Sequence, residues 1–404
     1  MPHTDQQFDI IIAGGGLSGV LSALSLAQLT QQDGSLLSIA VIESNPIHQK
    51  PKTTFDSRVL ALSHGSAHYL KSLSAWDDIA PHAAAIKKIH ISDRGHYGKA
   101  RLDAKDHQVS ALGYVVEMSV LGQAFLSALA KHKNITWFCP DHITAIDWQT
   151  ESVDITLNSS KQITGQLLLA CDGAQSSCRT FANITSLSKP YEQSALIANV
   201  SMEKAHDNVA FERFTASGPI AMLPLTESSE KSRKCSLVWT LTPEQAEEII
   251  ALDEQAFKKQ LEYAFGRWLG GVEKVGERAV YPLALVKANE QVFHRMVLVG
   301  NASHTIHPIA GQGFNLGLRD VQQLSETIAE NLKQGAELAS FSELTRYAVK
   351  RQADHEQVIT LTDSLVTLFS NDLPPLVAGR NIGLKVLNYF TPLKKRLVDK
   401  TMGY

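Results

Sequence analysis

Apolar runs alternate with helical patterns and glycine-rich turns in the first part of the chain. Residues 8–13 form a short β-rich run, and apolar positions at helical spacing follow over residues 20–29. A second apolar run, residues 38–42, ends at Glu43. The order strand, helix, strand predicts a βαβ unit with parallel strands, as found in α/β domains.

The turn between the first strand and the helix carries a glycine pattern. Gly14, Gly16 and Gly19 match G-x-G-x-x-G, and the acidic Glu43 closes the second strand. The glycines would admit a pyrophosphate to the helix N-terminus, and Glu43 could accept hydrogen bonds from ribose hydroxyls. The alternative is a glycine turn that merely packs the helix on the strand. The full strand–turn–helix–strand context favours a dinucleotide site.

A second loop of this kind lies late in the chain. The apolar residues 296–299 predict a buried strand, and the segment after Gly300 predicts a turn, a small-residue loop and a helix that begins near Gly313. Gly311 and Gly313 allow close backbone approach to a flat ligand. Backbone N–H groups from Gly311 to Phe314 would favour a ligand atom that becomes negative. A flavin reduced by hydride has such an edge, so the loop indicates a redox cofactor.

A third apolar run, residues 167–171, ends in Asp172 and Gly173, with Arg179 in the next segment. By itself an Asp-Gly pair indicates only a turn. After a buried strand, in a chain with two glycine loops, it is a further candidate for cofactor contact.

The remaining patterns predict a second sheet and a helical end. Runs within residues 195–202, 209–214 and 235–241 alternate as in an antiparallel sheet with one covered face. From Phe341 the pattern is helical, with breaks at Pro374 and Pro392. We expect the sheet to be inserted into the nucleotide-binding domain, where the two enclose an apolar pocket.

Composition narrows the function classes. The 404 residues suffice for two or three domains, and 44% hydrophobic with 20% charged residues is typical of a globular protein. A net charge of -3 without a basic block argues against nucleic acid as a ligand. The four cysteines show no C-x-x-C spacing, which predicts reduced thiols in a cytoplasmic protein. The polar start is not a signal peptide, and no apolar run reaches membrane-spanning length.

These motifs, in this order, resemble the class A flavoprotein monooxygenases, which are similar to para-hydroxybenzoate hydroxylase in fold. More specific matches lie in residues 56–62, 89–96, 195–200, 211–214, 218–220 and 307–320, and they resemble the FAD-dependent hydroxylases of ubiquinone biosynthesis. The similarity covers nearly the whole chain and is closest to the 2-octaprenyl-6-methoxyphenol subgroup. Gly300-Asn301 stands where most of the superfamily has Gly-Asp, and the asparagine favours the same subgroup. If it does not mark the subgroup, the lost charge weakens the expected hold on FAD.

The resemblance implies a Rossmann-like α/β FAD-binding domain interrupted by a mostly antiparallel substrate domain. The expected FAD-binding segments are residues 1–70, 111–180 and 291–340, the substrate domain is residues 71–110 and 181–290, and residues 341–404 form a C-terminal helical segment. It also implies that NAD(P)H reduces bound FAD and that O2 then forms a C4a-hydroperoxyflavin, which hydroxylates the ring of a polyprenyl phenol.

The resemblance also assigns roles to residues. Asp172 and Gly173 match a motif linked to FAD and nicotinamide cofactor binding, and Gly300, Asn301 and Pro308 match the motif that holds the ribityl chain. The resulting cofactor-binding set is Gly14, Gly16, Gly19, Glu43, Arg58, Asp172, Gly173, Gly300, Asn301, Pro308, Gly311, Gly313, Phe314 and Asn315.

Two assignments stay open on the sequence alone. Arg58 either lies near the flavin or pyrophosphate or forms a surface ion pair with Asp56. His304 and His307 either help deprotonate a phenol or bond the backbone of a tight loop, and the second reading is favoured. No metal site is predicted, because no His/Cys/Asp cluster has ligand spacing.

The basic C-terminal positions also have two interpretations. Arg380, Lys385, Lys394, Lys395, Arg396 and Lys400 form either a surface for anionic lipid at the inner face of the membrane or the solvated side of a helix packed on the core. Partners on the first view include the membrane and other ubiquinone-biosynthesis proteins. The function alternatives are a hydroxylase acting at another ring position or on another aromatic, and a non-catalytic prenyl carrier.

Overall fold

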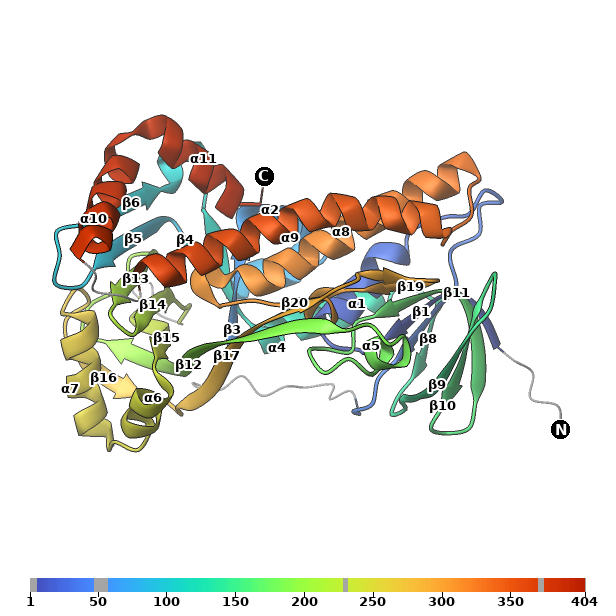
Figure 1. Cartoon of the computed structure of the whole chain (residues 1–404), viewed down its shortest axis with the longest axis horizontal. Helices are drawn as coiled ribbons and strands as arrows, with labels where there is room; N and C mark the ends of the chain where they lie inside the picture. The colour runs from blue at the N-terminus through green and yellow to red at the C-terminus, as the bar shows by residue number, and fades with distance from the viewer. Residues whose placement is uncertain (1–5, 47–56, 228–231, 370–373, 404) are drawn as a thin grey trace.

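A parallel sheet forms the centre of one half of the molecule (Figure 1). The computed structural model describes residues 6–46, 57–227, 232–369 and 374–403. The strand order is β18-β19-β11-β1-β2-β8, and the strands from β19 to β8 run parallel. The bounds are β1 (Gln6–Ala13), β2 (Ile39–Ile42), β8 (Ile135–Phe138), β11 (Gln162–Ala170), β18 (Val292–Phe293) and β19 (Met296–Leu298). The parallel strands predicted from the apolar runs are therefore confirmed.

Both faces of this sheet are covered, as the near-continuous apolar strands require. Alternate β1 side chains, such as Ile10 and Ile12, pack with helices α1 (Leu17–Leu26), α4 (Met118–Leu129) and α8 (Gln312–Gln334). Ile11 faces the other way, into a core shared with the antiparallel pair β9 (Ile143–Trp148) and β10 (Val153–Leu157) and with α5 (Ser177–Phe181).

A larger, mostly antiparallel sheet forms the other half, in the order β20-β17-β12-β15-β14-β13-β5-β6, with β16 on β12. Only the β13–β5 pairing in that order is parallel among the described strands. One face is covered by α6 (Pro243–Ile250) and α7 (Glu254–Phe265) through an apolar core that includes Trp239 and Phe257. The bounds are β5 (Lys88–Asp93), β6 (Lys99–Asp103), β12 (Ser186–Met202), β13 (Val209–Thr215), β14 (Gly218–Pro224), β15 (Lys234–Leu241), β16 (Val272–Val275), β17 (Ala279–Ala288) and β20 (His304–Thr305).

A small antiparallel sheet joins the halves. It consists of β3 (Val59–Ser63), β7 (Gly113–Glu117) and β4 (Ala84–Ile86), flanked by α2 (His64–Ser72) and α3 (Trp76–Ile79). Ala84, Ile86 and Val115 pack against Ala210 and Leu225 of the larger-sheet segment. Of the predicted insert 71–110, residues 88–103 thus lie in the larger sheet, while the part before them lies with α4 and the small sheet. The exact domain division remains a prediction.

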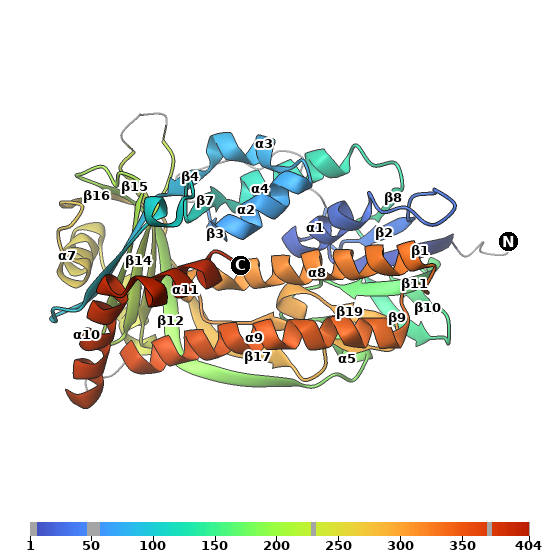
Figure 2. The same cartoon turned by 90° about the horizontal axis from the view of Figure 1, so that it is seen from above.

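Three helices end the chain: α9 (Phe341–Phe369), α10 (Pro374–Tyr389) and α11 (Thr391–Thr401). The helical pattern and its breaks near Pro374 and Pro392 are confirmed. Figure 2 shows α9 running beside α8 and continuing from the parallel-sheet half to the larger sheet. Within the part of the chain that is described, no helix has the length and apolar character needed to traverse a bilayer.

Candidate cofactor and active site

The glycines of the first loop have two different roles, close packing at two positions and open space at the third. A Cβ at Gly14, where φ is +97°, would lie 2.5 Å from the Cys171 carbonyl oxygen, and a Cβ at Gly19 would lie 1.8 Å from that of Gly14. These two glycines let β1, β11 and α1 pack closely. Gly16 differs, because a Cβ there would meet no atom within 4 Å. The empty space around Gly16 indicates a role in ligand binding rather than in packing.

The N-terminus of α1 suits an anionic ligand. Gly16 is the N-cap residue in extended conformation, and no side chain caps the first-turn N–H groups. Glu43, at the end of β2, accepts a hydrogen bond from the Gly15 N–H through Oε2 at 2.7 Å. The same carboxylate accepts one from the Asn45 N–H at 2.7 Å. The carboxylate is therefore held beside the glycine loop, where a ribose would follow a bound pyrophosphate.

The turn at Asp172 and Gly173 packs against the glycine loop between β1 and α1. Asp172 Oδ2 accepts hydrogen bonds from the Cys178 N–H at 3.0 Å and the Ser177 hydroxyl at 3.2 Å. Asp172 Oδ1 is buried, and no residue in the described ranges bonds it. Arg179 donates to the carbonyl oxygens of Ala302 at 2.9 Å and Ala174 at 2.8 Å. It thereby fixes the Asp-Gly turn to the loop that follows β19.

That loop begins in the short 3-10 turn Gly300–Ala302 and lies against the first turn of α1. A Cβ at Gly300, where φ is +61°, would lie 2.7 Å from the Ser18 hydroxyl oxygen. A Cβ at Gly317 of α8 would lie 3.1 Å from the Gly300 Cα. The side chain of Asn301 is exposed at this junction. The predicted ribityl-binding segment is thus adjacent to the predicted pyrophosphate-binding segment.

The start of α8 resembles the start of α1. Pro308 precedes the 3-10 turn Ile309–Gly311, and Gly311 is the N-cap in left-handed conformation, with φ +61° and no side-chain cap. A Cβ at Gly311 would lie 2.8 Å from the Ala61 Cβ, so β3 packs directly on this turn. A Cβ at Gly313 would meet only Ile306, at 3.9 Å. Phe314 is half-buried beside it. The predicted helix start is confirmed.

The hydrogen-bonding groups of the Asn315 side chain all bond to other groups of the protein. Its Oδ1 accepts from the Ser63 N–H at 2.8 Å and the Ser66 hydroxyl at 2.7 Å. Its Nδ2 donates to the carbonyl oxygens of Ala61 at 2.8 Å and Gly311 at 2.7 Å. With both lone pairs and both protons engaged, the side chain joins β3 to the start of α8 instead of offering a bond to a ligand.

Arg58 stands at the entrance to β3 with an exposed side chain, and its carbonyl oxygen accepts from the Met118 N–H at 2.9 Å. Asp56, the partner in the alternative ion pair, lies outside the described residues. Most of the other predicted cofactor residues follow the carboxyl ends of β1, β2, β11 and β19, where open α/β sheets bind ligands, and those from Pro308 to Asn315 lie at the start of α8. Two uncapped helix N-termini, the space at Gly16 and the unbonded Asp172 oxygen together fit FAD.

His307 is buried and neutral. Its Nδ1 accepts from the Ile309 N–H at 3.3 Å, and its ring meets the Tyr191 ring edge to face at 5.1 Å between centroids. Burial lowers the pKa of His307 to about 4. These contacts agree with the backbone-bonding reading of this histidine.

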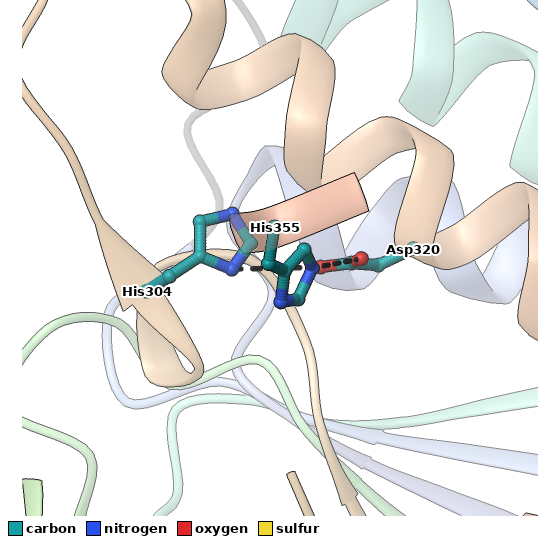
Figure 3. A group of neighbouring side chains, drawn as sticks. All are labelled: His304, Asp320 and His355. Atoms are coloured by element: carbon teal, nitrogen blue, oxygen red, sulfur yellow. Dashed lines mark hydrogen bonds and ion pairs between the residues drawn. The ribbon is translucent and has the colours of Figure 1, made fainter. Parts of the chain in front are cut away.

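His304 belongs to a buried cluster that the sequence did not reveal (Figure 3). Its Nδ1 lies 3.6 Å from Asp320 Oδ2, and His355 Nε2 lies 2.7 Å from Asp320 Oδ1. The guanidinium of Arg351 donates to Asp320 Oδ1 at 2.6 Å. Burial opposes ionisation of Asp320, but the neighbouring His355, His304 and Arg351 outweigh it and hold the pKa of this carboxyl far below its usual range.

His304, Asp320 and His355 come from β20, α8 and α9, so their separation in sequence hid the cluster. Their side-chain atoms lie within 4.8 Å of one another, close enough to consider a metal ion. Arg351 already supplies a positive charge to Asp320, and a divalent ion would add uncompensated charge to a buried site. We interpret the group as a charge network that fixes two segments to α8: helix α9 and the loop between β19 and α8, which we call the flavin loop. In the sequence, the i, i+4 spacing of Arg351 and His355 places both on one face of a helix, and this was the signal that could have revealed part of the network.

The buried histidines predict loss of stability in acid. Burial, which opposes the charged form, brings the pKa of both His304 and His307 to about 4 from an ordinary 6.5. Below pH 6.5 the unfolded chain binds protons that the folded chain does not, so the free energy of unfolding falls progressively from pH 6.5 to 4. The loss is at most roughly 3 kcal/mol for each histidine. Urea unfolding at pH 7, 6 and 5 measures it.

In the same experiment, His307→Asn should show a shallower pH dependence than the unchanged protein. Asp320 does not contribute to this pH dependence, because its lowered pKa keeps the carboxyl ionised throughout the range from pH 7 to 5. Equal slopes for the two proteins would contradict the buried-neutral assignment.

Comparison with known proteins identifies the class. The family model described as FAD binding domain matches residues 7–362. The chain belongs to this FAD-binding family, and FAD is its cofactor, as the two helix N-termini and the glycine loops indicate.

More particularly, the chain is a member of the FAD-dependent hydroxylases of ubiquinone biosynthesis. It is 32% identical to the ubiquinone hydroxylase UbiL of Rhodospirillum rubrum, over 99% of this chain and 90% of that protein. It is 31% identical to the mitochondrial ubiquinone biosynthesis monooxygenase COQ6 of Homo sapiens, over 98% and 92%. It is 32% identical to the 3-demethoxyubiquinol 3-hydroxylase of Escherichia coli, over 99% and 100%.

Solved structures agree on the fold. The p-nitrophenol 4-monooxygenase PnpA of Pseudomonas putida superposes with a TM-score of 0.78 at 19% identity, covering 98% of this chain and 99% of that one. A probable FAD-dependent monooxygenase of Pseudomonas aeruginosa, PqsL, gives a TM-score of 0.76 at 16% identity, over 94% and 100%. The expected interrupted FAD-binding fold and the monooxygenase class are confirmed.

Proposed function

We propose that this enzyme hydroxylates the aromatic ring of a 2-polyprenyl-6-methoxyphenol in ubiquinone biosynthesis. The observation that carries the proposal is the meeting of the uncapped N-terminus of α8 with an apolar sheet face. β3 packs on Gly311, and the same small sheet packs on Ala210 of the larger sheet. A ring bound there would lie between the flavin loop and apolar side chains.

When bound, FAD would supply oxygen activation at the expense of NAD(P)H, which is the chemistry that such cofactors bring. The chain's own groups do the rest. The N–H groups at the start of α8 favour negative charge on the cofactor edge, an effect of at most about 2 kcal/mol from the helix dipole, whereas the Gly311 N–H already donates to the Pro308 carbonyl oxygen at 3.0 Å. The apolar face of the larger sheet excludes water from the reacting atoms. The exposed Asn301 amide offers donors and an acceptor to a ribityl hydroxyl.

We assign the FAD contacts as follows. Gly16 and the first turn of α1 take the pyrophosphate, Glu43 the adenosine ribose, and Asp172 with Gly300 and Asn301 the ribityl chain. Gly313 and Phe314 face the ring system, and Arg58 lies at its entrance. Gly14, Gly19, Gly311 and Asn315 hold these segments in place.

The test uses purified protein loaded with FAD, NADH or NADPH, and 2-methoxy-6-prenylphenol with a short tail. We expect one hydroxylated product and loss of methoxyphenol conversion in a deletion strain. Turnover of a demethoxyubiquinol analogue instead would favour the second candidate, hydroxylation at another ring position. That candidate rests on the 32% identity to the Escherichia coli enzyme named for such a substrate. Purified protein without flavin absorbance after addition of FAD would favour a prenyl carrier.

The C-terminal helices support contact with a membrane surface, from which a polyprenyl substrate would come. Ile382, Val386 and Tyr389 lie on one face of α10 with exposed fractions of 62%, 44% and 82%. Not all of the predicted basic residues share this surface, because Arg380 is buried in an ion pair with Asp93 at 2.8 Å. Lys394 pairs with Asp106 at 3.0 Å.

Replacing Val386 and Tyr389 by serine should therefore weaken co-sedimentation with vesicles that contain anionic lipid, since both apolar insertion and nearby Lys385 contribute. Gly383→Ala, on the same exposed helix, is the control. Equal sedimentation of the serine variant and the unchanged protein would exclude this face as the contact.

A further inference from the structure

A carboxylate with no partner among the described residues lies on the inner face of the larger sheet. Glu212 is on β13, and its directly paired neighbours are Ala221 of β14 and Ile91 of β5. Because side chains alternate along a strand, Ala210 and Phe214 share its face. All four neighbours are apolar. A glutamate at this position interrupts an otherwise apolar patch.

This face is directed toward the nucleotide-binding half. Ala210 packs with Ile86 and Val115 of the small sheet. Asn199, on the same face two strands beyond β14, donates to the Ser57 carbonyl oxygen at 2.9 Å. Phe214 stacks on Phe369 of α9, with 3.7 Å between ring centroids. Glu212 therefore lies between the small sheet, whose strand β3 contacts Gly311, and the end of α9.

The other charges on this face are compensated. Asp93, beside Phe214, pairs with Arg380 of α10 at 2.8 Å. Lys234 pairs with Glu117 of β7 at 3.7 Å. Farther along β12, the Tyr191 hydroxyl donates to Asp363 of α9 at 2.6 Å. Arg58, next to Ser57 at the entrance to β3, adds a further charge close to this face, and its side chain is exposed.

Glu212 itself makes no hydrogen bond or ion pair with any residue that the structure describes. Burial alone raises the pKa of its carboxyl to about 7. The Glu212 side chain is half-buried among apolar neighbours, and an unpaired carboxyl in such surroundings is unfavourable unless a ligand donates a hydrogen bond to it. The face that would cover the substrate ring thus carries a strong hydrogen-bond acceptor for which no described residue is a donor.

We propose that the Glu212 carboxylate accepts a hydrogen bond from the ring hydroxyl of the phenolic substrate and so fixes the orientation of the ring over the flavin loop. The inference rests on the proposed function and adds the residue that recognises the phenol. A phenol hydroxyl entering an apolar pocket loses its water partners, as does the carboxylate, and each satisfies the other. Bonds to ionised acceptors are roughly twice as strong as neutral ones.

The test compares two ligands that differ only in the hydroxyl: 2-methoxy-6-prenylphenol and its deoxy analogue. Their dissociation constants are measured by calorimetry on the FAD-loaded enzyme and on Glu212→Ala and Glu212→Gln. Glu248→Gln, an exposed position on α6, makes the same chemical change outside the pocket. We expect the unchanged enzyme and the control to prefer the phenol by at least about tenfold at pH 8.

In Glu212→Ala the preference should vanish while the affinity for the deoxy analogue stays nearly constant. In the unchanged enzyme the preference should rise from pH 6 to 8 as the carboxyl ionises, and Glu212→Gln should show no such rise. A purely structural role of Glu212 would lower both affinities together and would not remove the pH dependence. The isosteric glutamine variant decides the matter if the alanine variant fails to fold.

Persistent discrimination between the two ligands in Glu212→Ala, or a preference that still rises from pH 6 to 8 in Glu212→Gln, would overturn this proposal and leave the proposed function intact. Failure of the unchanged, FAD-loaded enzyme to bind either ligand would overturn the proposed function, and the role of Glu212 with it.

Discussion

Gly16→Val should lower the affinity for FAD by more than about tenfold, or 1.4 kcal/mol, with little change in the stability of the FAD-free protein. An added Cβ would meet no protein atom within 4 Å, so folding has no reason to fail. It would instead occupy the space at the N-terminus of α1 that we assign to the pyrophosphate. Flavin fluorescence titration gives the affinity, and urea unfolding of the FAD-free protein gives the stability.

Gly383→Val is the matched control, because a Cβ at Gly383 on α10 also meets nothing within 4 Å. It should leave FAD affinity unchanged. Gly19→Val offers the opposite contrast, since its Cβ would lie 1.8 Å from the Gly14 carbonyl oxygen and should prevent folding. An FAD affinity of Gly16→Val within tenfold of the unchanged protein would disprove the assignment of this loop.

Asp320→Asn should cost about 3 to 5 kcal/mol of the free energy of unfolding, the range found when one partner of a buried ion pair is removed. The side chain of Asp320 is fully buried, and the Arg351 side chain is only 7% exposed. Asparagine has the same shape but removes the fully buried negative charge beside Arg351, which then keeps only the part-exposed Asp354 as its counter-charge. Chemical denaturation at pH 7 measures the loss.

Asp354→Asn serves as the comparison. Asp354 also pairs with Arg351, at 2.8 Å, but its side chain is 28% exposed, so water can replace the lost contact and the expected cost is smaller. Equal losses for the two variants would mean that burial of charge does not determine the stability of this cluster.

The parallel sheet and its glycine loops were predictable from sequence because each uses a local signal. β1, α1 and β2 follow one another without interruption, and the predicted start of α8 near Gly313 differs from the observed Gln312 by one residue. Glycine spacing alone, however, did not separate Gly16 from Gly14 and Gly19. That distinction depends on which atoms of β11 and of the loop itself come near each Cα, and those contacts form only in the folded chain.

The charge network and Glu212 could not be predicted for a related reason. Asp320 and Arg351 lie 31 positions apart, on helices whose relative rotation decides whether they meet. Glu212 sits in an alternating strand pattern that also fits a solvent-facing glutamate. Its partial burial follows from the packing of the small sheet and α9 on the inner face, which no local pattern encodes.

Helix α9 also restricts how the enzyme can open. Its 29 residues extend over roughly 43 Å, and it packs on β18 in one half and β14 in the other. Because α9 packs on both halves, it prevents a hinge motion between them. Separating the halves would bend the helix or break its contacts with one of the sheets. We expect the isoprenoid tail of the proposed substrate to enter and leave through local rearrangement of loops, and the rate of product release to respond to loop changes rather than to the stability of the interface between halves.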